Sequence, residues 1–183
     1  MNEPSIYTLG HSDRTKEAFL QLLKGAGIRH LLDIRTFPQS RRFPHFDSEA
    51  IRELVEGVGI VYHRVGRPFG GRRDASPASP HLALDESLRG FADYMASDAF
   101  DRAVKQLISL ADREGPLALM CAERLPEHCH RRLLADTLLL RGREVWHLID
   151  TTQTRRHMLS PEGRQVGGQL VYDRGANETL TFH

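Results

Sequence analysis

The sequence has few cysteines and almost no net charge, and each of these features excludes some kinds of protein. Its 183 residues include two cysteines, one tryptophan and a formal net charge of +1. Two cysteines cannot build a disulfide framework, and such low usage is typical of a reducing compartment. A near-zero net charge argues against the global basic field of a dedicated nucleic-acid-binding protein.

Long apolar segments and export signals are also missing. No hydrophobic run approaches the ~20 residues that a membrane helix requires. Residues 1–4 show neither the basic stretch nor the apolar stretch with which a secretory signal begins. We therefore expect a cytoplasmic protein with no membrane partner.

Familiar cofactor signatures are absent as well. The glycines at 25 and 27 follow a predicted helix, whereas a dinucleotide-binding fingerprint follows a strand. Cys121 and Cys129 lack the Cys-x-x-Cys spacing of redox or zinc motifs. The sequence thus indicates no particular cofactor, metal or oligomeric state.

Short apolar runs alternate with helical periodicity along most of the chain. The predicted strands cover residues 6–9, 30–34, 60–63, 117–121 and 144–149, and the predicted helices cover residues 15–24, 47–58, 86–96, 98–115 and 127–140. This alternation predicts an α/β fold with a mainly parallel open sheet and helices on both faces, in a Rossmann-like or rhodanese-like layering.

Two segments fall outside this alternation. Residues 66–80 are rich in Gly, Pro, Ser and Arg, which predicts a long loop. Residues 150–183 form a polar, basic C-terminal extension in which only Gln169–Tyr172 resembles a strand, expected at an edge. Because no repeat or second apolar core is visible, we expect a single domain over residues 1–183.

Chemically active side chains are densest between residues 121 and 131. A predicted strand ends at Cys121, Glu123 follows, and a helix predicted from residue 127 carries Cys129, His130 and Arg131. Open α/β sheets bind ligands at such strand-to-helix turns. A nearby cation or helix N-terminus lowers a thiol pKa, which makes Cys121 the candidate nucleophile and Cys129 a second thiol. The alternative is a buried cysteine that acts only as a small apolar residue.

Other candidates follow the remaining strands. His11 ends the first strand after Gly10, and Asp33 and Arg35 flank the end of the second. Because parallel strands share one C-terminal edge, we expect these side chains to converge with Cys121. Asp33 could act as a base, orient a histidine or bind metal, or its pairing with Arg35 could only fix the loop. His11 and His130 are candidate proton carriers, and Glu123 a further catalytic carboxylate.

Cationic and small polar residues near this edge predict anion binding. Residues 70–73 have the composition of a flexible basic flap. The candidate anion-binding residues are Arg35, Ser40, Arg41, Gly70, Gly71, Arg72 and Arg131.

These motifs resemble one bacterial family, the domain-of-unknown-function 488 family. The resemblance is carried by residues 8–12, 33–35 with 38 and 40–41, 59–60, 69–73, 91–95, and 118–123 with 129–131, the last block being the most specific. It spans residues 6 to about 149. It implies an α/β fold with a shared motif edge, and no established activity, substrate or cofactor.

Three functions remain open. The first is an enzyme that acts on or binds a phosphorylated or otherwise anionic small molecule or nucleic-acid component at the Cys/His/Asp/Arg site. The second is a thiol or sulfur-transfer enzyme that uses Cys121. The third is a non-catalytic nucleic-acid or partner-binding module that uses the arginines of residues 64–73 and the basic C-terminal tail. We favour the first.

Overall fold

The computed structural model describes residues 5–176, so residues 1–4 and the last seven residues of the C-terminal extension lie outside the described part. A six-stranded sheet has the strand order β3-β2-β4-β1-β5-β6, in which only β6 is antiparallel to its neighbour. The strands are β1 (Ile6–Gly10), β2 (His30–Asp33), β3 (Val61–Arg64), β4 (Leu117–Cys121), β5 (Val145–Leu148) and β6 (Thr154–Arg156).

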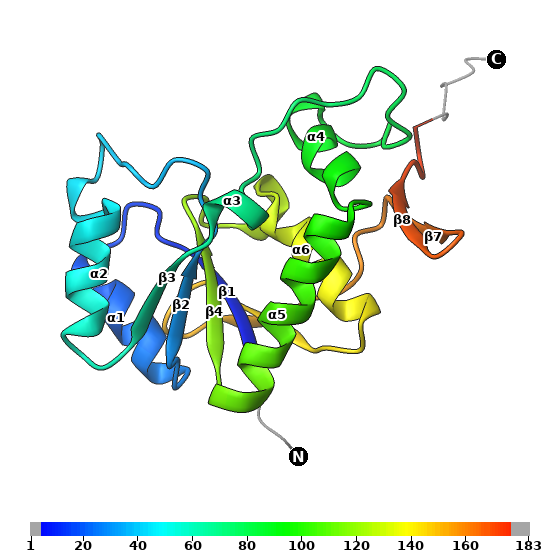
Figure 1. Ribbon diagram of the computed structural model, residues 1–183. Helices are drawn as coiled ribbons and strands as arrows, with labels where there is room; N and C mark the ends of the chain where they lie inside the picture. The colour runs from blue at the N-terminus through cyan, green and yellow to red at the C-terminus, as the bar shows by residue number, and fades with distance from the viewer. Residues whose placement is uncertain (1–4, 177–183) are drawn as a thin grey trace.

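Helices cover both faces of the sheet, as Figure 1 shows. The helices are α1 (Lys16–Gly25), α2 (Ser48–Glu56), α3 (Gly66–Phe69), α4 (Glu86–Tyr94), α5 (Asp98–Glu114) and α6 (Arg131–Leu140), with short 3-10 turns η1 (Pro44–Phe46) and η2 (Pro126–His128). Apolar residues of α1 and α2 pack on one face of the sheet, and those of α4, α5 and α6 pack on the other. The predicted fold class is confirmed.

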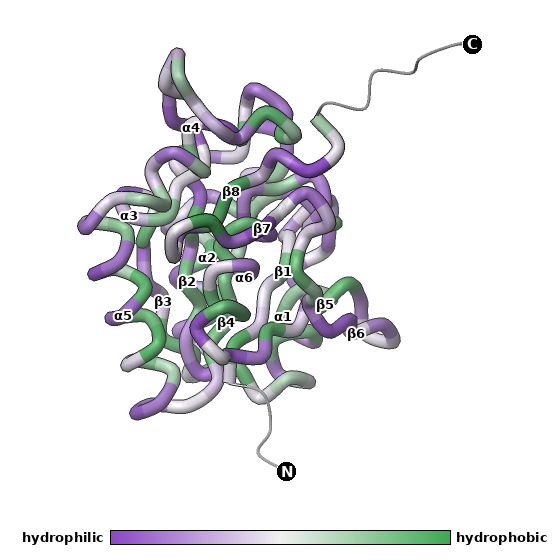
Figure 2. Tube along the Cα trace, turned by 90° about the vertical axis from the view of Figure 1, so that its right-hand side faces the viewer, coloured by the Kyte–Doolittle hydropathy of each residue, from purple (hydrophilic) through white to green (hydrophobic). Residues whose placement is uncertain are grey.

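Strand alternation explains the two layers of core. Along β4, Leu117, Leu119 and Cys121 belong to the core beneath α5 and α6, whereas Ala118 and Met120 belong to the core beneath α1 and α2. All five β4 residues are buried, because a central parallel strand has helices on both sides. In Figure 2 green runs through the central strands, while β6 is mostly purple.

Side-chain caps begin two of the helices, α1 and α5. Thr15 caps α1 by accepting a hydrogen bond from the Ala18 N–H. Ser97 caps α5, and its hydroxyl accepts a hydrogen bond from the Phe100 N–H. α2 ends at Glu56, two residues before the predicted end at residue 58, and Val58 is exposed.

The helix predicted from residue 127 begins at Arg131. Pro126 starts the separate 3-10 turn η2, and Cys129 then has an extended backbone with φ −138° and ψ 143°. An extended residue cannot be part of an α-helix, so α6 begins only after His130. Cys129 therefore precedes the helix, and the helix N-terminus lies further from Cys121 in sequence than predicted.

Two loop expectations also need correction. Residues 66–69, expected to be loop, form the single turn α3, and the rest of the 66–80 segment has no further helix or strand. The C-terminal extension holds more strand than predicted. β6 extends the main sheet, and the predicted Gln169–Tyr172 strand, β8, pairs with β7 (Gly163–Val166) in a separate hairpin rather than at a sheet edge. Among residues 5–176, no helix is long and apolar enough to cross a membrane.

Candidate thiol site

The topology opens a crevice at the C-terminal end of β4. The chain leaves β1 and β2 toward the α1 and α2 face, whereas it leaves β4 toward α6 on the opposite face. Because the connections diverge, the loops after these neighbouring strands leave a gap between them, which is where open α/β sheets bind ligands. Cys121, the last residue of β4, lies at this gap.

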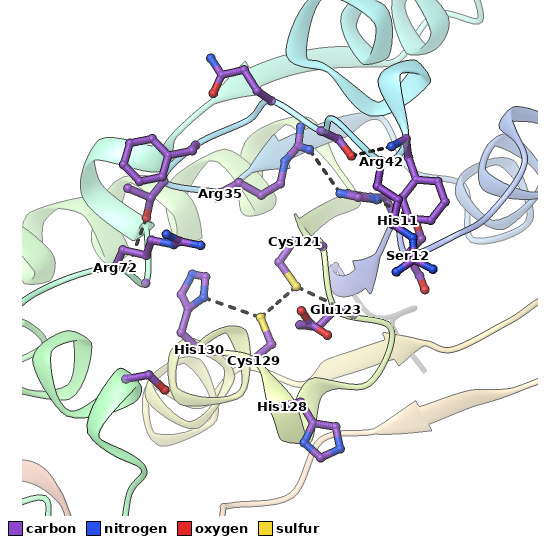
Figure 3. Close-up of a pocket in the computed structure, with 18 of the residues that line it drawn as sticks. His11, Ser12, Arg35, Arg42, Arg72, Cys121, Glu123, His128, Cys129 and His130 are labelled. Carbon is purple, nitrogen blue, oxygen red and sulfur yellow. Dashed lines mark hydrogen bonds between the residues drawn. The ribbon is translucent and has the colours of Figure 1, made fainter.

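The two cysteines of the chain are in contact across this gap. The Cys129 thiol donates a hydrogen bond to the Cys121 sulfur, with 2.8 Å between the two Sγ atoms. Both side chains are buried, with exposed fractions of 3% and 4%, and both line the same pocket. Figure 3 shows the sulfurs facing one another beside His130.

Arg131 lies beneath the sulfurs and is completely buried. Its Nη1 donates to the Cys121 sulfur at 2.6 Å and to the Glu123 carbonyl, and its Nη2 donates to the Arg124 carbonyl at 2.8 Å. Its Nε donates to the Thr8 hydroxyl at 3.2 Å. All these donors bind groups of the protein. The guanidinium therefore contacts the Cys121 sulfur from within the protein and does not line the pocket.

The environment separates the two thiols electrostatically. Burial raises the pKa of Cys121, but the hydrogen bond from Cys129 and the charge of Arg131 outweigh it, so that the pKa is lowered to about 7. Burial raises the pKa of Cys129, and donation to Cys121 raises it further. At pH 7 about half of Cys121 is thus ionised while Cys129 keeps its proton, as in a nucleophile beside a second, protonated thiol.

His130 faces the second thiol. Its Nε2 is 2.8 Å from the Phe69 carbonyl, which can only accept, so Nε2 carries the proton. Burial, opposed by this hydrogen bond and assisted by Arg131, lowers the pKa of His130 to about 4. The neutral ring therefore presents a lone pair on Nδ1, 3.6 Å from the Cys129 sulfur. This nitrogen can receive the Cys129 proton.

Asp33 belongs to a separate cluster on the other face of the sheet. In the register of the parallel strands Asp33 is the partner of Met120, so its side chain and that of Cys121 point to opposite faces. Its carboxylate is completely buried, forms a bidentate pair with Arg35 at 2.8 and 2.6 Å, and accepts from the Tyr62 hydroxyl at 2.7 Å. This pairing holds Arg35 in place and leaves Asp33 out of the pocket wall.

His11 joins that cluster and reaches the pocket. Arg35 Nη1 lies 3.3 Å from His11 Nε2, and since a guanidinium only donates, Nε2 is the acceptor. The proton is then on Nδ1, 3.0 Å from the Ser12 carbonyl. Burial chiefly lowers the pKa of His11 to about 4, and its ring stacks on Phe46 with centroids 4.5 Å apart. Both ring nitrogens are engaged by the protein.

The pocket that contains the sulfurs has a volume of about 760 Å³. Of the predicted site residues it is lined by His11, Arg35, Ser40, Gly71, Arg72, Cys121, Glu123, Cys129 and His130. Asp33, Arg41, Gly70 and Arg131 do not line it. Figure 3 shows Arg42 and Arg72 on opposite sides of the opening.

Several residues of the site had no clear signal in the sequence. Phe37 and Arg42 line the pocket and were not among the predicted ligands. The Thr8 hydroxyl, which accepts a hydrogen bond from Arg131, also lies 2.7 Å from His147 Nδ1. His147 is hydrogen-bonded to His157, and His157 is hydrogen-bonded to Asp136. A single polar residue inside an otherwise apolar strand, Thr8 in β1 and His147 in β5, could have indicated this buried network, because such residues require partners inside the protein.

Gly10 fixes the backbone around the sulfurs. A Cβ at Gly10 would lie 1.8 Å from the Glu123 carbonyl oxygen, so the close approach that glycine allows is to the protein's own chain and not to a ligand. Gly71 packs in the same way on the ring of His130.

We expect Gly10→Ala to lower the free energy of unfolding by about 3 kcal/mol, the upper end of typical overpacking costs, because the clash is with backbone. Urea denaturation followed by circular dichroism measures this. The control is Gly25→Ala at the end of α1, where the new Cβ meets nothing within 4 Å. An equal loss in both variants would contradict this account of Gly10.

Metal binding was one possible role of Asp33 in the sequence. Across the described residues, no group of three or more His, Cys, Asp and Glu side chains is arranged to hold a metal ion. The side chain of Asp33 points to the other face of the sheet from Cys121. The Nε2 atom of His11 accepts a hydrogen bond from Arg35.

Comparison with known proteins bears on this geometry. The family described as "Domain of unknown function DUF488" matches residues 15–138, more than half of the chain. The chain belongs to this family. The DUF488 match includes Cys121, Cys129, His130 and Arg131, whereas His11 and strand β5, part of the resemblance seen in the sequence, lie outside it. No curated protein and no solved structure matches the chain.

Proposed function

We propose that the protein is a thiol-dependent enzyme in which Cys121 is the nucleophile and Cys129 the resolving thiol. The observation that carries the proposal is the 2.8 Å contact between the two sulfurs beside a buried arginine 2.6 Å from one of them. A resolving thiol must reach the nucleophilic sulfur without rearrangement of the backbone, and this contact supplies that proximity.

The proposed reaction has two displacements. The Cys121 thiolate attacks one sulfur of a substrate disulfide, forming a mixed disulfide while the other sulfur leaves with the electron pair as a thiolate. Cys129 then gives its proton to His130 Nδ1 and attacks the Cys121 sulfur. The remaining half of the substrate leaves as a thiolate. The substrate is reduced by two electrons and the protein holds a Cys121–Cys129 disulfide. Two external thiols reduce this disulfide and are themselves joined as a disulfide.

This proposal keeps the anionic substrate favoured by the sequence and, of the two candidate catalytic residues Cys121 and Asp33, assigns the chemistry to Cys121. Asp33 is paired with Arg35 and Tyr62, which leaves it unsuited to act as a base. Arg42 and Arg72 on the pocket wall favour a negatively charged substrate. A hydrolase that uses Asp33 therefore has less support than thiol chemistry at Cys121.

The aromatic anionic disulfide 5,5′-dithiobis(2-nitrobenzoate) tests the proposal. We expect the wild-type protein to release two thionitrobenzoate ions and retain none, because Cys129 resolves the first adduct. Cys129→Ser is expected to release one and retain one as a mixed disulfide on Cys121. Cys121→Ser is expected to react more than tenfold more slowly than the wild type, since its remaining thiol has a raised pKa.

Absorbance of the released ion and mass spectrometry of the intact protein give both readouts, and urea denaturation confirms that the serine variants are folded. Equal rates for Cys121→Ser and the wild type would reject Cys121 as the nucleophile. A wild-type protein that retains two adducts would reject Cys129 as the resolving thiol.

A further inference from the structure

A second pocket adjoins the thiol site and is surrounded by arginines. It has a volume of about 390 Å³ and is lined by Thr36, Arg64, Gly66, Arg67, Gly70, Arg72 and Arg73. We call it the arginine pocket. Within residues 5–176, no Asp or Glu side chain lines it.

The positive charge of the arginine pocket is not compensated by the protein. Arg143, Arg156 and Arg164 elsewhere on the surface each pair with a carboxylate. In the part of the chain that the structure describes, no ion pair involves any of the four arginines of the pocket. Like charges held around one hollow repel each other, and a bound anion removes that repulsion.

Arg73 is held in place by contacts with neighbouring backbone and with an aromatic ring. Arg73 donates through Nε to the Gly70 carbonyl at 3.1 Å and through Nη2 to the Arg67 carbonyl at 2.7 Å. Its guanidinium also lies 3.4 Å from the centre of the Tyr94 ring. These contacts tie the Arg73 side chain to the backbone of residues 67–70, next to Arg67 and Arg72.

The arginine pocket and the thiol pocket meet along a shared wall. Thr36 and Arg72 line both, and the Thr36 hydroxyl accepts from the Arg72 backbone N–H at 3.2 Å. Phe37, the next residue, lines the thiol pocket with 61% of its surface exposed, and the Arg72 guanidinium lies 5.6 Å from its ring centre. An exposed aromatic ring therefore stands where the two pockets join.

We propose that the arginine pocket and Phe37 bind a single strand of nucleic acid, with phosphates among the arginines and a base stacked on the ring. Arginines that follow a backbone and aromatic rings that stack bases are the two elements by which proteins bind single strands. In a duplex the bases are stacked on one another, so their faces are closed to Phe37. The inference rests on the proposed function in one respect, that the next nucleotide along the strand extends toward Cys121.

The net charge of +1 is consistent with this ligand. A binding protein needs positive charge only where the strand lies, and the carboxylate-paired arginines elsewhere contribute little to the field at the arginine pocket. The near-zero total thus argues against a surface that is basic all over, and not against a local site.

Fluorescence anisotropy with a 5′-labelled single-stranded 12-mer measures the binding. We expect R64Q/R67Q to weaken affinity about tenfold or more at low salt, because phosphate contacts dominate such binding. The slope of log affinity against log salt should become shallower by about 1.4, since each phosphate contact to a single strand contributes about 0.7. Phe37→Ala should weaken binding without changing this slope, because it removes stacking and no charge.

The matched control is R102Q/R113Q, which removes the same charge from two exposed arginines of α5 outside the arginine pocket. Affinity within twofold of the wild type is expected. Weakening equal to that of R64Q/R67Q would overturn the proposal, because it would show general electrostatic attraction. Absence of 12-mer binding at low salt, or equal affinity for adenosine monophosphate, would overturn it as well.

The assay is independent of thiol chemistry. Failure of strand binding with the disulfide reaction intact would overturn this inference alone. Strand binding without the disulfide reaction would overturn the thiol proposal alone.

Discussion

Replacing Arg131 by glutamine is expected to slow alkylation of Cys121 by iodoacetamide at pH 7 about sixfold or more. With a pKa of about 7, half of the thiol is ionised at that pH. Without the guanidinium, burial is opposed mainly by the hydrogen bond from Cys129, and we expect the pKa to rise by about two units, so that about 1% of the thiol is ionised at pH 7. The more basic thiolate is intrinsically about eightfold more nucleophilic, which offsets part of the roughly 50-fold loss of thiolate.

The pH profile separates this electrostatic role from a loss of packing. In the wild type, the alkylation rate of Cys121, followed peptide by peptide with mass spectrometry, should be half-maximal near pH 7. In Arg131→Gln the midpoint should move up by about two pH units, and the plateau at high pH should exceed that of the wild type. A slower rate with an unchanged midpoint would contradict the proposed role of Arg131.

The same substitution should also destabilise the protein. Arg131 is fully buried, and its loss leaves the Glu123 and Arg124 carbonyls without this donor. Unpaired buried groups of this kind cost about 1–3 kcal/mol each. Should Arg131→Gln fail to fold, Arg131→Lys keeps the charge, is expected to keep the Cys121 pKa near 7, and still loses the contacts that need a planar guanidinium.

Acid destabilisation is the second large effect that we expect. Burial, with help from the charges of His157, Arg131 and Arg155, lowers the pKa of His147 from 6.5 to about 3. The unfolded chain therefore binds this proton more readily than the folded protein does. The free energy of unfolding should then be unaffected by His147 above pH 6.5 and should decrease as the pH falls from 6.5 toward 3, by up to about 4 kcal/mol.

His147→Gln tests this assignment, because glutamine is polar and does not titrate. Urea unfolding measured between pH 7 and pH 4 should show a smaller pH-dependent loss in the variant than in the wild type. The slope of the free energy of unfolding against pH should differ between the two proteins by an amount that approaches the uptake of one proton per molecule on unfolding. His128→Gln, at an exposed histidine of the pocket rim, is the control and should leave the slope unchanged. Identical slopes for His147→Gln and the wild type would contradict the assignment.

The sequence predicted a helix or strand well where interactions between residues near one another in the chain determine it. Leu117–Cys121 was predicted with its observed bounds, because five consecutive apolar residues satisfy a central strand and Gly115 and Pro116 stop the preceding helix. For α6, the predicted first residue, 127, lies four positions before the observed first residue, Arg131. Pro126 and Glu127 suit a first turn, but the backbone of Cys129 is extended and its sulfur contacts Cys121, a residue of another element.

The candidate site was predicted in location and only partly in arrangement. Cys121, Cys129 and His130 come together as the shared strand edge suggested. Asp33 was expected in the same group, yet the register of β2 against β4 turns it to the other face. A shift of one residue would have reversed that outcome, and strand register depends on packing across the sheet.

By itself the sequence determined the alternation of strands and helices, the strand edge that carries the reactive side chains and the presence of two thiols within one turn. These follow from apolar periodicity and chain order, which act over a few residues. Only the tertiary structure decided that Arg131 points at a sulfur and not at solvent, that Asp33 neutralises Arg35, and that arginines 64 to 73 surround one hollow beside Phe37. Those outcomes depend on which buried groups find partners across the sheet, and the free energy of such pairing is set by residues distant in the chain.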